Sequence, residues 1–260
     1  MTNKKLMVGS IFFEGKNGYI APNDKWIELQ RHFLNKTSPE YDHVVGVCGK
    51  LDLDLFKSSI VLGNSGITIQ DYKNQLRVML DFFKSNSKKY EAFLLLDSDA
   101  FPIMDGWFDI LTKFMKSKNK WYSSPLRIEN LDFWPHLSCF FILSEYIDFD
   151  IIDFTGKKYN NIYGEESIEF GAGNKSVIDD KHIWLPLLRS NIWNPHPIIS
   201  AVYSHVFYHH GAGSRHKVFR GDESLLFDER IQLNDEQLQK KLFDNPERFI
   251  GRLLGKFNYY

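Results

Sequence analysis

The chain has 260 residues, with 32 basic and 33 acidic side chains and a formal charge of −1. This balance provides no overall positive field, so it argues against a nucleic-acid-binding protein and against attraction to an anionic membrane. Apolar residues make up 43% of the chain and aromatic residues 15%, which is typical of a well-packed globular protein and excludes a disordered one.

Two cysteines and the apolar runs indicate the compartment. Cys48 and Cys139 lie in apolar segments and form no C-x-x-C pair, so we expect reduced, buried thiols. The apolar run near the start, residues 6–13, is interrupted by Gly9 and Ser10 and is interpreted as a first strand. Reduced thiols fit the cytosol, so we expect a cytoplasmic protein. No apolar run approaches the ~20 residues of a membrane helix, so we expect no segment that spans a bilayer.

Strand and helix patterns alternate through the first half of the chain. The predicted strands are residues 6–13, 42–49, 58–64, 67–69, 91–96, 120–125 and 136–143. The predicted helices are residues 23–34, 71–86 and 106–117, the second with Asp71 as its cap. This alternation is typical of an open α/β sheet.

The second half of the chain has a weaker pattern. We expect a helix over 165–170, a strand over 200–210, and one or two amphipathic helices in the tail. These elements predict a domain over residues 1–220 and a C-terminal helical extension over 221–260 that packs on it. The alternative for the tail is peripheral contact with a membrane, since its basic and aromatic residues suit an interface.

The segment "FLLLDSDAFPI", residues 93–103, changes abruptly from apolar to acidic at Asp97 and Asp99. A strand that is apolar on both faces stops where the chain emerges at a sheet edge, and α/β sheets bind ligands there. Side chains at i and i+2 of an extended segment point the same way, so both carboxylates can share a Mn²⁺ or Mg²⁺ ion that also binds phosphate oxygens. The alternative is a pair of solvated loop carboxylates.

The segment "VFYHHGAGSR", residues 206–215, is a second candidate site. A neutral imidazole can bind Mn²⁺, the glycines allow backbone N–H groups to approach an anion, and Arg215 offers a guanidinium to phosphate oxygens. On one continuous strand His209 and His210 face opposite sides, and we favour His209 as the metal ligand. The alternative is two surface histidines at a hairpin.

"LLLDSDAFPI" resembles the D-x-D strand end of nucleotide-diphospho-sugar glycosyltransferases with the GT-A fold, and the helix over 71–86 precedes it as in that family. His209 and Arg215 match the histidine and lysine of the H-x-x-G-x-x-K-P segment of glycogenin-like members, whereas the glycine and proline do not match. The resemblance covers about residues 5–220. It implies a GT-A (Rossmann-like) mixed central sheet flanked by helices.

The resemblance also implies a function and its residues. It implies a divalent-metal-dependent transferase of hexosyl or pentosyl groups from a UDP- or GDP-sugar to a glycan or lipid-linked acceptor. Asp97, Asp99 and His209 would bind the metal, with Asp99 central to catalysis. The implied contacts to the nucleotide, donor sugar or diphosphate come from Ser10, Asn74, Arg77, Asp97 and Arg215.

Glu169 is the candidate general base. An inverting transferase needs a base near the acceptor hydroxyl, whereas a retaining one needs a nucleophile or assistance from the donor phosphate. In a helix over 165–170 Glu165 and Glu169 share a face, and burial against Phe170 is expected to raise the pKa of Glu169. The alternative is that these carboxylates are solvated.

Other interpretations remain open at this stage. A sugar-phosphate nucleotidyltransferase also uses acidic residues on an α/β sheet, although the dense glycine-rich phosphate loop of that class is absent after the first strand. A catalytically silent nucleotide-sugar-binding module is the other alternative. Trp134 and Trp193 are candidates either for the core or for an acceptor platform, since indoles stack on sugar faces.

Overall fold

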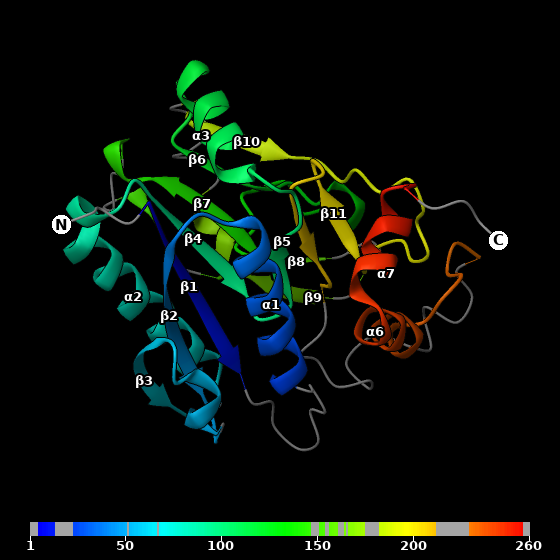
Figure 1. The fold of residues 1–260 in the computed structure, drawn as a ribbon, viewed down its shortest axis with the longest axis horizontal. Helices are drawn as coiled ribbons and strands as arrows, with labels where there is room; N and C mark the ends of the chain where they lie inside the picture. The colour runs from blue at the N-terminus through cyan, green and yellow to red at the C-terminus, as the bar shows by residue number, and fades with distance from the viewer. Residues whose placement is uncertain are drawn as a thin grey trace.

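The computed structural model is built around one large sheet (Figure 1). The residues that the structure describes are 5–13, 23–50, 52–66, 68–146, 151–153, 156–160, 164, 166–174, 182–211 and 229–256. The strands are β1 (Leu6–Phe13), β2 (Tyr41–Cys48), β3 (Ile60–Ser65), β4 (Ala92–Asp97), β5 (Ala100–Pro102), β6 (Tyr122–Pro125), β7 (Cys139–Leu143), β8 (Lys157–Asn160), β9 (Glu166–Glu169), β10 (Trp184–Leu187), β11 (Ala201–Tyr203) and β12 (Phe207–His209). The helices are α1 (Asn23–Thr37), α2 (Ile69–Asn86), α3 (Trp107–Ser117), α6 (Asp235–Asp244) and α7 (Pro246–Leu253).

The large sheet has the strand order β10-β6-β7-β4-β1-β2-β3. β1 is parallel to β2 and β4, and β2 is parallel to β3, so these four strands end at the same edge of the sheet. β7 is antiparallel to β4 and β6, which makes the sheet mixed. The expectation of an α/β fold with a mixed central sheet flanked by helices is confirmed. Cys48 and Cys139 are buried thiols, as predicted.

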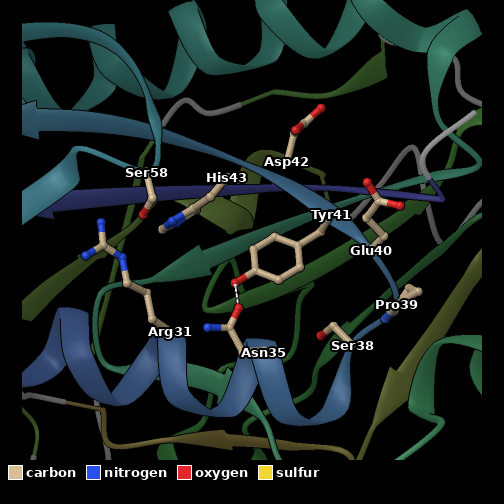
Figure 2. A pocket seen from close by; sticks show the side chains of 9 residues that line it. All are labelled: Arg31, Asn35, Ser38, Pro39, Glu40, Tyr41, Asp42, His43 and Ser58. Carbon is tan, nitrogen blue, oxygen red and sulfur yellow. Dashed lines mark hydrogen bonds between the residues drawn. The ribbon is translucent and has the colours of Figure 1, made fainter.

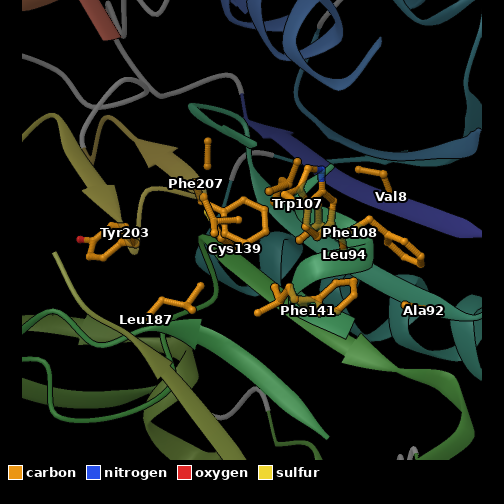
Figure 3. Packing of buried hydrophobic residues seen from close by; sticks show 14 of the residues in the cluster. Val8, Ala92, Leu94, Trp107, Phe108, Cys139, Phe141, Leu187, Tyr203 and Phe207 are labelled. Carbon is orange, nitrogen blue, oxygen red and sulfur yellow. The ribbon is translucent and has the colours of Figure 1, made fainter. Parts of the chain in front are cut away.

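Both faces of β4 are covered by helices. Leu94 belongs to a cluster with Trp107 and Phe108 of α3 on one face (Figure 3). Phe93 stacks on Phe83 of α2 on the other face, with ring centroids 4.8 Å apart. Successive side chains of a strand point to opposite faces, so burial on both sides explains why this strand is apolar at every position before its aspartate.

Two local predictions are wrong. The predicted strand at 67–69 fails because Thr68 is the N-cap of α2 and Ile69 already begins the helix; Asp71 completes the capping box by accepting the Thr68 N–H. The predicted helix over 165–170 fails because β9 occupies 166–169 and pairs with β8. Cross-strand pairing at β9 thus replaces the expected helical turn.

The C-terminal helices pack onto α1 and β12. Leu238 of α6 and Leu253 of α7 share a hydrophobic cluster with Trp26 of α1 and Tyr208 of β12. The helical extension expected here is confirmed, whereas a domain boundary at residue 220 stays a prediction. The apolar face of α7 is buried in this cluster, so it is not available to a membrane surface. Among the described residues, no helix has the length and apolar character needed to cross a bilayer.

Candidate metal centre

The two aspartates lie where the chain leaves the large sheet. β4 ends at Asp97, and the chain then enters β5, which belongs to a separate three-stranded sheet of order β11-β12-β5. The side chain of Asp97 is 29% exposed and that of Asp99 is 6% exposed. Both carboxylates therefore lie at the carboxyl edge of the parallel strands, where α/β proteins bind ligands.

The predicted continuous strand over 200–210 is wrong, because the chain reverses within it. Ser204 and His205 have positive φ angles of 49° and 60°. The Val206 N–H donates to the Tyr203 carbonyl (2.9 Å), as in a type I′ hairpin turn. The result is a β11–β12 hairpin in which β12 returns to pair with β5.

The pairing of β12 with β5 brings a histidine to the aspartates. His209 Nε2 lies 3.6 Å from Asp97 Oδ2 and 3.5 Å from Asp99 Oδ1. One ligand atom from each of these three residues lies within 4.8 Å of the other two. His210 instead faces α6, where its Nε2 is 2.8 Å from Asp235 Oδ1. Of the two histidines, the structure places His209 with the aspartates.

The outer oxygens of both carboxylates are held by hydrogen bonds. The Tyr72 hydroxyl donates to Asp97 Oδ1 (3.2 Å). The Gly211 N–H donates to Asp99 Oδ2 (3.1 Å). These bonds leave Asp97 Oδ2 and Asp99 Oδ1 facing the imidazole, as expected for carboxylates that are oriented by partners outside the ligand set.

The chemistry of this donor set fits a divalent cation. Burial and the neighbouring Asp99 raise the pKa of Asp97 to about 6, because two carboxylates in a buried site repel each other. Burial lowers the pKa of His209 well below its ordinary value of 6.5, so the imidazole is neutral and its lone pair can bind a metal. Two carboxylates and one neutral imidazole suit Mn²⁺. Mg²⁺, a harder cation that prefers oxygen ligands, is the alternative.

A second polar cluster lies beside the first. Arg127 Nε is 3.3 Å from Asp132 Oδ2, and Arg127 Nη1 is 2.6 Å from His136 Nε2. The same His136 nitrogen is 3.3 Å from Glu169 Oε2, and the His136 ring lies 5.4 Å from that of His209. Asp132, His136 and Glu169 also have metal-ligand spacing. Because the Arg127 guanidinium already supplies a positive charge among them, we assign no metal to this cluster.

The expected rise in the pKa of Glu169 is wrong. Burial by itself would raise that pKa, but His136, Arg127 and the Gly171 N–H outweigh it and lower the pKa to about 2. Glu169 therefore stays ionised, and an ionised carboxylate with so low a pKa is a weak proton acceptor. Its charge also contributes to the raised pKa of Asp97, which places Glu169 within electrostatic reach of the first cluster.

The other predicted residues lie in different surroundings. Ser10 is fully buried, and its hydroxyl donates to Gln30 Oε1 (2.8 Å). On α2, Asn74 accepts a hydrogen bond from Gln70 (3.1 Å) and Arg77 is exposed. Their roles stay predictions. The predicted diphosphate ligand Arg215 lies outside the described residues.

Sequence reasoning missed three residues that contact this site. Tyr72 lies on the same helix as the predicted Asn74 and Arg77, and it is the side chain that contacts Asp97. His136 contacts His209. Neither Tyr72 nor His136 lies in a sequence pattern that indicates a binding site. Gln30 did carry one. It is a polar residue on the apolar stripe of α1, four residues after Trp26 and four before Leu34, and such a position indicates a buried polar partner.

The two tryptophans considered as sugar platforms differ in their contacts. Trp193 is 7% exposed, donates from its indole to Gln232 Oε1 (2.9 Å) and packs with Phe249, so it belongs to the core. Trp134 is half-buried and meets the Tyr159 ring edge-on at 5.0 Å. Only for Trp134 does the platform interpretation stay a prediction.

Comparisons with known proteins assign no family to this chain. No family model matches it, and no curated protein matches it. Among solved structures it is similar to a candidate nucleotide-diphospho-sugar transferase from Desulfovibrio desulfuricans G20, at 10% identity over 71% of this chain and 80% of that chain, with a TM-score of 0.46. It is also similar to the glycosyltransferase GlyE of Streptococcus pneumoniae TIGR4, at 12% identity over 55% of this chain and 34% of that one (TM-score 0.34), and to the galactosyltransferase LgtC in complex with donor and acceptor sugar analogues, at 10% identity over 56% and 62% (TM-score 0.34). Likenesses this weak do not establish an activity.

Proposed function

We propose that this protein is a divalent-metal-dependent glycosyltransferase that moves a sugar from a nucleotide-diphosphate donor to a glycan or lipid-linked acceptor. The observation that carries the proposal is the convergence of Asp97 Oδ2, Asp99 Oδ1 and His209 Nε2 at the carboxyl edge of the parallel strands. The D-x-D sequence at a strand end supports the GT-A assignment. When bound, Mn²⁺ or Mg²⁺ would supply the positive charge that a diphosphate leaving group requires.

The protein's own residues have distinct tasks in this proposal. Asp97 and Asp99 hold the cation, with His209 as the neutral third ligand. We also assign to Arg215, which lies outside the described residues, the task of neutralising the diphosphate. Leaving-group charge is stabilised by groups fixed in place before the reaction, which is the largest contribution in many enzymes.

For Glu169 the low pKa changes the proposed role. A carboxylate that remains ionised is better suited to stabilise positive charge on the transferred sugar than to accept a proton. A sugar ring gains such charge in an oxocarbenium-like transition state. We therefore place Glu169 as an electrostatic group, held by His136 and Arg127.

Calorimetric titration with a panel of UDP- and GDP-sugars, with and without Mn²⁺, tests the proposal. We expect one nucleotide to bind only with metal, and the Asp99→Asn variant to lose this binding. The matched control is Asp109→Asn, which changes an exposed carboxylate on α3 that forms an ion pair with Lys5. Binding that is independent of both the metal and Asp99 would contradict the proposal.

A further inference from the structure

A buried glutamine on α1 spans the loop that carries the two aspartates. Gln30 is fully buried, and its Nε2 donates to the carbonyls of Asp97 (2.9 Å) and Ala100 (2.8 Å). These carbonyls belong to the last residue of β4 and the first residue of β5, so one amide group connects both ends of the D-S-D segment. Both N–H groups of the amide are used in these two bonds.

A chain of hydrogen bonds determines the orientation of this amide. Arg31 Nη2 donates to Ser59 Oγ (3.4 Å), and Ser59 Oγ lies 3.1 Å from His43 Nδ1. His43 Nε2 lies 3.2 Å from Ser10 Oγ, which donates to Gln30 Oε1 (2.8 Å). The single Ser10 proton is used by the glutamine, so His43 must donate from Nε2 and accept from Ser59 at Nδ1. Every donor in the chain thus points from Arg31 toward the loop.

The outer end of the chain lies on the wall of a cavity. Arg31 and His43 line a cavity of about 520 Å³ between α1 and the start of β2, and Figure 2 shows both side chains at one end of it. His43 is 7% exposed, and burial together with Arg31 lowers its pKa to about 3, so it stays neutral with one ring proton. A fixed single proton keeps the direction of the chain unchanged around neutral pH.

The opposite orientation of the amide is excluded by its partners. A rotated Gln30 would direct Oε1 at two carbonyl oxygens and Nε2 at a hydroxyl whose proton already faces it. The loop has two further backbone ties, from the Asp97 N–H to the Ser138 carbonyl and from the His210 N–H to the Asp99 carbonyl, both 3.0 Å. Neither of these two bonds involves the Asp97 or the Ala100 carbonyl, to both of which Gln30 donates.

We infer that Gln30 is a positioning residue that holds the D-S-D loop in the conformation in which both aspartates face His209. The inference rests on the proposed metal site, because its consequence is tighter metal binding. Partners that orient metal ligands typically change metal affinity by about 10–100-fold. Ser10 and His43 act through Gln30 and not on the metal.

The test is Mn²⁺ binding to the free protein, measured from the electron paramagnetic resonance signal of unbound Mn²⁺. The Gln30→Met variant keeps the side-chain length and removes the amide, and we expect its Kd for Mn²⁺ to rise about tenfold or more. The matched control is Gln75→Met, which changes another buried glutamine, 6% exposed, on α2 at the opposite face of the sheet. Its Kd is expected to stay within about twofold of the wild type.

A second readout does not depend on metal. Hydrogen exchange of peptides covering 97–103 and 206–211 should become faster in Gln30→Met without metal and stay unchanged in Gln75→Met. If Gln30→Met does not fold, Ser10→Ala replaces it, because this variant removes only the hydroxyl that donates to Gln30 Oε1. We then expect a smaller rise in the Kd for Mn²⁺ and a smaller increase in loop exchange. Wild-type Mn²⁺ affinity together with unchanged loop exchange in these variants would overturn the inference.

The failure of this inference differs from failure of the proposed function. If the wild type binds no Mn²⁺, the proposed function is overturned, and so is the expected effect of Gln30 on metal affinity. Hydrogen exchange in the loop then still decides whether Gln30 holds the loop. If both glutamine variants lose thermal stability equally and keep wild-type Mn²⁺ affinity, Gln30 is merely structural and the positioning role is overturned.

Discussion

Acid should destabilise this protein through His43. The folded protein holds His43 neutral with a pKa of about 3, whereas the unfolded chain binds a proton near the ordinary value of 6.5. Protons therefore bind preferentially to the unfolded chain as the pH falls from 6.5 toward 3, and the free energy of unfolding decreases. Each pH unit in this window removes ~1.4 kcal/mol, so about 2 kcal/mol is lost by pH 5. Against a typical total of roughly 5–15 kcal/mol this loss is easily measured.

Urea unfolding followed by tryptophan fluorescence at pH 7.5, 6 and 5 measures this loss. The His43→Asn variant should be less stable at pH 7.5, because the hydrogen-bond chain is broken, yet it should lose about 2 kcal/mol less than the wild type between pH 7.5 and pH 5. The control His205→Asn changes an exposed histidine whose positive φ of 60° suits asparagine, and it should follow the wild type. Equal losses in wild type and His43→Asn would refute the reasoning.

Two further predictions concern the support of the metal centre. Tyr72→Phe removes the hydroxyl that orients one aspartate, so the Kd for Mn²⁺ should rise about tenfold. Tyr90→Phe loses a hydroxyl that donates to Asp42, so it should not change the Kd for Mn²⁺. Equal effects of both variants would contradict the proposal that the Tyr72 hydroxyl orients Asp97. Gly171→Ala would place a Cβ 1.9 Å from the Pro135 carbonyl oxygen and should displace the second polar cluster, lowering the proposed sugar-transfer activity at least tenfold. In Gly173→Ala the three atoms nearest the added Cβ all belong to the Asp153 side chain, at 2.6 to 3.2 Å, and none to the backbone. A side chain can move aside more easily than a backbone carbonyl, so activity close to wild type is expected, and similar losses in the two alanine variants would exclude this steric explanation.

The sequence by itself determined most of the helices and strands of the α/β sheet. Apart from β10, which was not predicted, the large-sheet strands and α1, α2 and α3 follow from the spacing of apolar residues, because burial of one face or both faces leaves a period in the chain. Asp97 and Asp99 could be found for the same reason, since two carboxylates ending a doubly buried strand mark the edge of a sheet. Gln30 could have been found as a polar residue on an apolar helix face, although it was not predicted.

Only the tertiary structure decided which histidine joins the aspartates. The hairpin turns at Ser204 and His205, which carry none of the glycine or asparagine typical of a type I′ turn, so the sequence favoured one continuous strand. The approach of Asp99 and Gly211, 112 residues apart in sequence, depends on the pairing of β12 with β5. Tyr72 and His136 reach the site in the same way, through packing between distant segments. Such contacts depend on how segments distant in sequence pack in space, which leaves no period in the local sequence.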